Sequence, residues 1–90
     1  MSWAYLVRCR DGSLYAGWAA DVEKRVAAHN AGTGAKYTRG RGPVSLALAE
    51  EYETKNQAMV REAALKRMTK AQKEALVKEY RAGKKDAEEV

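Results

Sequence analysis

The stretch SLYAGWAADVEKRVAAHN, residues 13–30, begins like a β-strand and ends like an α-helix. Residues 13–19 are predicted to form the strand. The helix is predicted to begin near Asp21, a favourable N-cap, and to end near Gly32, because glycine commonly follows a helix end. This change from strand to helix provides the frame for predicting the rest of the chain.

The residues before this stretch predict a second strand. Residues 3–9 alternate in the manner of a half-buried strand, with Tyr5 on the same face as the other large side chains. The Asp11-Gly12 pair that follows is a strong hairpin signal. The two strands are therefore expected to pair as antiparallel neighbours, which brings Tyr5 and Tyr15 close together.

The residues after the stretch predict one more strand and two helices. Residues 44–53 alternate again, and two capping boxes predict helices over residues 55–68 and 70–81. The element order is then ββαβαα. This order predicts an α+β fold in which helices flank a three-stranded antiparallel sheet.

The composition predicts one small globular domain. The chain has 90 residues with 46% hydrophobic content, and we place the domain at residues 1–82 and a charged, frayed tail at residues 83–90. A single cysteine, Cys9, excludes an intramolecular disulfide framework and a cysteine-based metal cluster. We expect no signal peptide, no membrane span and a reducing, cytoplasmic location. The net charge of +5 permits a polyanionic partner without demanding one.

The predicted helix turns Arg25 and His29 toward its valines. At about 100° per residue, both fall within roughly 100° of arc shared with the valines of the same helix. In one interpretation Arg25 packs its aliphatic stem there and pairs with Glu50 or Glu51, while His29 is a partly buried surface residue. In the other, the two side chains are polar partners for the hydroxyls of Tyr5 and Tyr15, which are otherwise plain core aromatics.

Together these residues resemble the GIY-YIG nuclease superfamily, in its small bacterial stand-alone form. The parts of the sequence that carry the resemblance cover about residues 2–78: AYL at 4–6, LYAG at 14–17, DVEKRVAAHN at 21–30, GTGAKYTRGRGPV at 32–44 and MVREAALKR at 59–67. The first signature lacks its glycine and isoleucine, and the second has Ala16 in place of isoleucine. No asparagine follows Glu62, whereas several nuclease members have one there.

The resemblance implies a metal-dependent endonuclease that hydrolyses phosphodiester bonds in DNA, with low sequence selectivity or a structure preference. Glu62 would hold the divalent metal, Mg²⁺ or Mn²⁺, and Arg25 would bind the phosphate oxygens. One of the two tyrosines would position or deprotonate the water, and His29 would exchange a proton or orient a tyrosine. The catalytic set is thus Tyr5, Tyr15, Arg25, His29 and Glu62. Helix spacing alone favours a solvated Glu62 paired with Lys66.

The glycine-rich loop resembles a nucleic-acid contact surface. It holds Lys36, Arg39 and Arg41 without any acidic residue, and its Tyr37 could stack on a base. The alternative is a solvated connection. At the level of the whole chain, the alternative to a nuclease is a non-catalytic nucleic-acid-binding module that retains the fold. The oligomeric state is left open.

Overall fold

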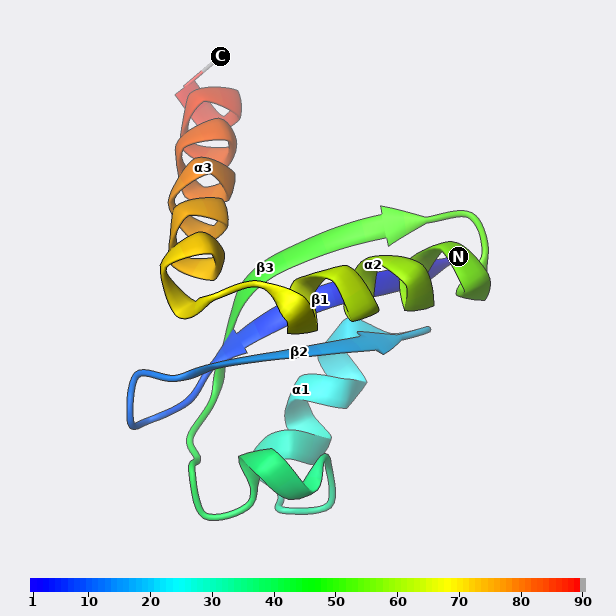
Figure 1. Cartoon of the computed structure of the whole chain (residues 1–90), viewed down its shortest axis with the longest axis vertical. Helices are drawn as coiled ribbons and strands as arrows, with labels where there is room; N and C mark the ends of the chain where they lie inside the picture. The colour runs from blue at the N-terminus through cyan, green and yellow to red at the C-terminus, as the bar shows by residue number, and fades with distance from the viewer. Residues whose placement is uncertain (90) are drawn as a thin grey trace.

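The computed structural model describes the backbone of residues 1–89 and the side chains of residues 1–82. It confirms the predicted α+β fold and the order ββαβαα, with one short 3₁₀ turn added in the loop (Figure 1). The elements are β1 (Ser2–Arg8), β2 (Leu14–Ala19), α1 (Val22–Asn30), η1 (Lys36–Thr38), β3 (Ser45–Tyr52), α2 (Lys55–Arg67) and α3 (Lys70–Glu89).

The last helix differs most from its predicted bounds. Helix α3 continues to Glu89, whereas the sequence predicted an end at Arg81. The helix runs through Gly83, because a glycine costs a helix only about 1 kcal/mol relative to alanine and does not by itself end it. The side chains of residues 83–90 lie outside the described residues, so the domain boundary at residue 82 and the frayed tail stay predictions.

The sheet places β1 in the centre, in the order β2-β1-β3 with both pairings antiparallel. Tyr5 therefore lies opposite Gly17 on one side and Ala49 on the other. The hairpin between β1 and β2 closes at Gly12, whose φ of 86° lies in the left-handed region that glycine adopts without strain. The sequence prediction that Tyr5 and Tyr15 sit on paired neighbouring strands is confirmed.

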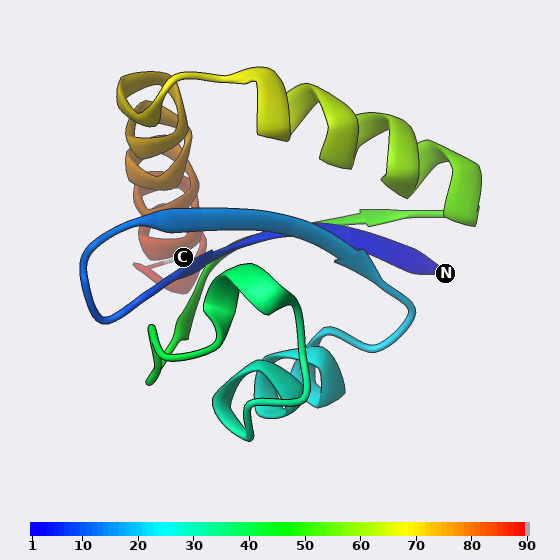
Figure 2. The same ribbon diagram turned by 60° about the horizontal axis from the view of Figure 1, so that its bottom comes forward.

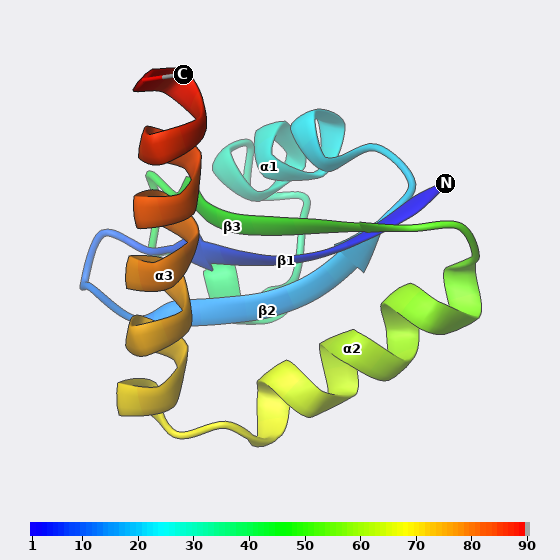
Figure 3. The same ribbon diagram turned by 90° about the horizontal axis from the view of Figure 1, so that it is seen from above.

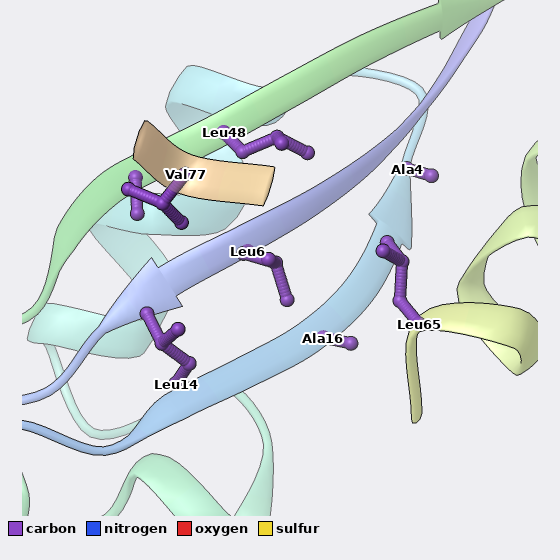
Figure 4. Packing of buried hydrophobic residues seen from close by; sticks show 8 residues of the cluster. Ala4, Leu6, Leu14, Ala16, Leu48, Leu65 and Val77 are labelled. Atoms are coloured by element: carbon purple, nitrogen blue, oxygen red, sulfur yellow. The ribbon is translucent and has the colours of Figure 1, made fainter. Parts of the chain in front are cut away.

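Helices cover both faces of the sheet. Figure 2 shows α2 and α3 on one face and α1 with η1 on the other, and Figure 3 shows α3 crossing one end of the strands. The alternation of β1 divides the buried side chains between two clusters. The cluster under α2 and α3 contains Ala4, Leu6, Leu14, Ala16, Ala47, Leu48, Leu65 and Val77 (Figure 4). The cluster facing α1 contains Tyr5, Val7, Cys9, Ala19 and Val44.

Ion pairs attach helices α2 and α3 to the sheet. Arg8 of β1 grips Glu74 of α3 with two hydrogen bonds of 2.6 and 2.9 Å, and it also donates to the carbonyl of Gly12. Glu50 of β3 accepts from Arg61 of α2 at 2.8 Å. The bidentate geometry fixes orientation as well as distance. Among the described helices, none combines the length and the apolar character needed to cross a membrane.

Candidate active site

The centre of the candidate site is a buried tyrosine–histidine pair. Tyr5 and His29 are each only 1% exposed, and the Tyr5 hydroxyl lies 2.8 Å from Nε2 of His29. The Tyr5 ring lies across Gly17 of the neighbouring strand, where an added Cβ would overlap the phenol oxygen and its carbon. A glycine at position 17 therefore leaves the space that the tyrosine needs to reach helix α1.

The second nitrogen of His29 is held by the loop that follows α1. Its Nδ1 lies 2.9 Å from the hydroxyl of Thr38, and that hydroxyl donates to the carbonyl of Ala35 at 2.8 Å. Since the Thr38 hydroxyl has one proton, it accepts from Nδ1–H, which leaves Nε2 bare to accept from Tyr5. The Ala35 N–H lies 3.3 Å from Nδ1 and would favour the opposite tautomer. The two shorter contacts outweigh this longer one.

A glycine lets the loop close over the imidazole. A Cβ added at Gly34 would overlap Nδ1 of His29 and lie 2.9 Å from its Cα. The end of α1 is anchored nearby, because Asn30 accepts from the N–H of Val44 at 2.6 Å and donates to its carbonyl at 3.1 Å. The loop is thus folded onto the site rather than a solvated connection along its whole length.

Burial and charge decide the protonation of the pair. Burial raises the pKa of Tyr5 above 10.0, and the nearby Arg25 guanidinium opposes this while Tyr15 and Glu62 add to it. Burial lowers the pKa of His29 below 6.5, and the charge of Arg25 lowers it further. At neutral pH the phenol therefore keeps its proton while the imidazole is uncharged and able to accept one.

Tyr15 belongs to a ladder of stacked side chains beside this pair. Its ring meets His29 edge-on, with centroids 5.6 Å apart, and stacks on Tyr37 at 5.5 Å with the planes 20° apart. The Arg41 guanidinium covers the Tyr37 ring at 4.4 Å and pairs with Asp11 at 2.7 Å. Tyr37 and Arg41, both predicted to contact nucleic acid, are therefore engaged within the protein in this structure.

Glu62 reaches the site from the opposite helical layer. It lies half-buried on α2, within electrostatic reach of Tyr5, because its charge raises the pKa of that phenol. Its carboxylate is 3.7 Å from the ammonium of Lys66, which lies 5.8 Å from the Tyr15 ring centroid. Glu62 therefore pairs with Lys66 and also borders the site, but it is half-buried rather than solvated. Strand β2 separates the layers that supply Glu62 and His29.

The structure brings Tyr5, Tyr15 and His29 into contact and places Arg25 and Glu62 within electrostatic reach of Tyr5. Arg25 is half-buried and acts on both Tyr5 and His29. The interpretation that Arg25 pairs with Glu50 or Glu51 is wrong, because no ion pair joins Arg25 to either among the described residues, and Glu50 is bound by Arg61. The interpretation of His29 as a partly buried surface residue is also wrong.

The remaining basic loop residues differ from Arg41. Lys36 and Arg39 are exposed and have no hydrogen bond or ion pair among the described side chains. Sequence reasoning missed Gly34 and Thr38, because a loop has no periodicity that says which side chains face inward. Two hollows of the surface, with volumes of about 390 and 560 Å³, lie beside Trp3 and Tyr52 respectively. Neither is lined by a predicted site residue.

The donor set suits a metal that needs few protein ligands. Within the described residues, no three side chains of the His, Cys, Asp and Glu types gather as a metal cage. Glu62 offers one hard carboxylate near the tyrosines. Mg²⁺ is commonly bound through one or two carboxylates while it keeps waters and substrate phosphates, so the site fits such an ion.

Replacing His29 with glutamine is expected to flatten the pH dependence of stability between pH 7 and 5. The folded-state pKa of His29 lies below its unfolded value of 6.5, so below that pH the unfolded chain binds the proton more readily. The wild-type free energy of unfolding therefore falls as pH falls, by at most about 1.4 kcal/mol per pH unit. Urea denaturation at both pH values measures this, and equal pH dependence in both proteins would contradict the assignment.

Comparisons with known proteins place the chain in a family. The profile of the family described as "GIY-YIG catalytic domain" matches residues 1–75. The UPF0213 protein VNG_2274C of Halobacterium salinarum is 53% identical over 84% of this chain and 99% of its own length. The UPF0213 protein CPE1444 of Clostridium perfringens is 51% identical over 86% of this chain and 83% of its own length.

Two structures solved by NMR are also similar. The protein EF2693 of E. faecalis has a TM-score of 0.59 and 41% identity, covering 91% of this chain and 88% of its own. The UPF0213 protein BH0048 of Bacillus halodurans has a TM-score of 0.56 and 42% identity, covering 87% and 84%. The two matches cover 87% and 91% of this chain, so the similarity extends over nearly the whole domain.

Proposed function

Because the chain belongs to the GIY-YIG family, whose members are typically endonucleases, we propose that it is a metal-dependent endonuclease acting on DNA, with low sequence selectivity or a preference for particular strand structures. One observation carries the proposal: the Tyr5 hydroxyl is held on a bare Nε2 of His29 while Arg25 and Glu62 act on the same phenol. We propose the cytoplasm as its location.

The pair offers a route for the proton of the attacking water. A water placed against the Tyr5 oxygen gives its proton to that oxygen as the phenol proton moves to Nε2 of His29. The raised pKa of Tyr5 disfavours a free phenolate, so the proton must be passed on rather than stored. We therefore propose Tyr5 as the base rather than Tyr15, whose ring meets His29 edge-on and stacks on Tyr37.

Arg25 supplies charge where the phosphate gains it. Its planar guanidinium can donate two parallel hydrogen bonds to non-bridging phosphate oxygens. A half-buried donor is oriented before the substrate arrives, and one such donor is worth roughly 3–4 kcal/mol in the transition state. Its proximity to His29 also keeps the imidazole neutral, and so able to accept a proton.

Glu62 is the residue that would hold the divalent cation, which we propose to be Mg²⁺ or Mn²⁺. Bound there, the cation would supply charge stabilisation for the phosphate and the leaving oxygen. The Lys66 ammonium stays near Glu62 and adds positive charge on the same side.

The exposed part of the loop is the proposed backbone contact. Lys36 and Arg39 extend from the loop, whereas Arg41 is tied to Asp11 and Tyr37. Contacts to phosphate carry no base information, so selectivity for sequence is expected to be low. Affinity is expected to fall steeply with added salt, because each neutralised phosphate releases counterions.

A second candidate function is a non-catalytic nucleic-acid-binding module. It is favoured by the absence of an asparagine after Glu62 and by the contact of Glu62 with Lys66, which partly neutralises the only carboxylate proposed to hold metal. Such a module would bind DNA in a salt-dependent way and cleave nothing.

The test is cleavage of labelled single-stranded, nicked and branched DNA with Mg²⁺ or Mn²⁺. The proposal predicts products that vanish when a chelator is added and return with metal. The double variant Lys36→Ala/Arg39→Ala is expected to weaken binding while leaving the site intact. Binding to DNA without turnover on any substrate under either metal would replace the nuclease proposal with the binding module.

A further inference from the structure

A small basic pocket lies directly beside the candidate site. It has a volume of about 180 Å³ and is lined by Ser13, Leu14, Tyr37, Lys70 and Lys73. Tyr37 is shared between the two, because its ring stacks on Tyr15 of the candidate site. On the basis of the proposed function, we propose that this pocket binds a backbone phosphate of the same DNA strand that is cleaved. This phosphate is a different one from the scissile phosphate.

The charges around the pocket leave it cationic. Two carboxylates close to the lining residues are already paired with arginines: Glu74, beside Lys73, with Arg8 at 2.6 Å, and Asp11, which accepts from Ser13, with Arg41 at 2.7 Å. Neither Lys70 nor Lys73 forms an ion pair among the described side chains, although Lys70 lies near enough to Glu74 to lower the pKa of that carboxyl. Lys73 is half-buried, where a charge without a counterion is costly. A phosphate would supply the missing anion.

The fold holds the two lysines in place. The bidentate grip of Arg8 on Glu74, one residue after Lys73, ties the start of α3 to strand β1 and the hairpin turn. The same arginine also donates to the carbonyl of Gly12, in the turn that leads into Ser13. The loop is held to the same segments by the stacking of Tyr37 on Tyr15 and by the pairing of Arg41 with Asp11. The pocket is therefore lined by residues of three segments in contact with one another.

Lys66 connects this pocket to the site. Its ammonium lies 5.8 Å from the centroid of the Tyr15 ring, at the end of α2 just before the turn to α3. Tyr15 joins the two places, because its ring contacts His29 in the site and Tyr37 at the pocket. A strand whose scissile phosphate meets Arg25 would then present a phosphate further along its backbone to the pocket on α3.

The test measures binding in a cleavage-impaired background, so it does not depend on turnover. The Glu62→Gln protein is titrated with labelled single-stranded DNA between 50 and 200 mM salt, with and without Lys70→Gln/Lys73→Gln. Losing one charge-assisted phosphate contact is expected to weaken binding roughly tenfold and to reduce the log–log salt slope by about 0.7. Circular dichroism checks that the variants are folded.

The matched control is Lys24→Gln/Lys78→Gln, which removes two exposed lysines outside the pocket. The proposal predicts that this control binds like its parent. Equal weakening by both pairs would show a diffuse effect of net charge and would overturn the pocket assignment, as would unchanged binding by Lys70→Gln/Lys73→Gln. An inactive wild type that shows the expected binding difference would overturn only the nuclease proposal.

Discussion

Replacing Arg25 with alanine is expected to lower the rate of DNA cleavage about 100- to 1,000-fold. The guanidinium is half-buried and acts on both Tyr5 and His29, so alanine at this position removes the positive charge beside them. The loss corresponds to removing one preorganised donor from the transition state, roughly 3–4 kcal/mol. Single-turnover cleavage of a labelled substrate with saturating protein measures the step directly and separates it from binding.

Two further variants sharpen this prediction. Arg25→Lys keeps the charge but loses the planar fork, and is expected to recover only part of the rate. Lys24→Ala removes the neighbouring cation on the exposed side of the same helix, and is expected to cleave at the wild-type rate. If Arg25→Ala and Lys24→Ala cleave equally fast, Arg25 has no role in the chemistry.

Replacing Gly17 with alanine is expected to abolish measurable cleavage and to destabilise the fold. The new Cβ would overlap the Tyr5 hydroxyl, and neither strand can retreat because Gly17 and Tyr5 are paired within the β1–β2 ladder. Tyr5 must then move away from His29, which leaves two buried polar groups without a hydrogen-bond partner. Each such group lowers the free energy of unfolding by about 1–3 kcal/mol. Overpacking adds a cost of about 1–3 kcal/mol.

Gly42→Ala is the matched control for this change. Apart from its chain neighbours, the atom nearest to a Cβ at Gly42 would be Oδ1 of Asn30 at 3.9 Å, so this variant is expected to keep near-wild-type activity and stability. Urea denaturation gives the two stabilities, and the His29 ring signals in NMR report whether the Tyr5 bond survives. A Gly17→Ala protein with wild-type stability and activity would show that Tyr5 does not need to lie over residue 17.

Much of the fold could be predicted because its signals are local. The alternation of residues 3–9, the Asp11-Gly12 turn and the capping boxes each act within a few residues, and the structure confirms the elements that they predict. The continuation of α3 past Arg81 could not be predicted, because it is decided by the whole helix rather than by a local signal.

The candidate site was predictable only in part. Helix spacing places Arg25 and His29 toward the sheet, and strand pairing brings Tyr5 and Tyr15 together. Helix geometry could not single out Glu62, because α2 lies on the other face of the sheet from α1 and nothing in its spacing points to the site. The family resemblance singled it out.

The loop could not be predicted from its composition. Its basic residues look equivalent in the sequence, yet Arg41 is held by Asp11 and Tyr37 while Lys36 and Arg39 are exposed. Tertiary contacts make this division, and they also bring Thr38 onto His29. The loop therefore combines residues that hold the histidine with residues whose side chains are exposed.

The most direct test of a single hydrolytic site is the single-turnover cleavage rate of wild type, Glu62→Gln and Glu51→Gln, measured with Mg²⁺ on one labelled DNA substrate. Glu51 is an exposed glutamate on β3 and serves as the matched control. The proposed mechanism predicts that Glu62→Gln loses at least 100-fold in rate while still binding DNA, and that Glu51→Gln cleaves like wild type. Equal cleavage by all three proteins, or none by the wild type, would contradict it.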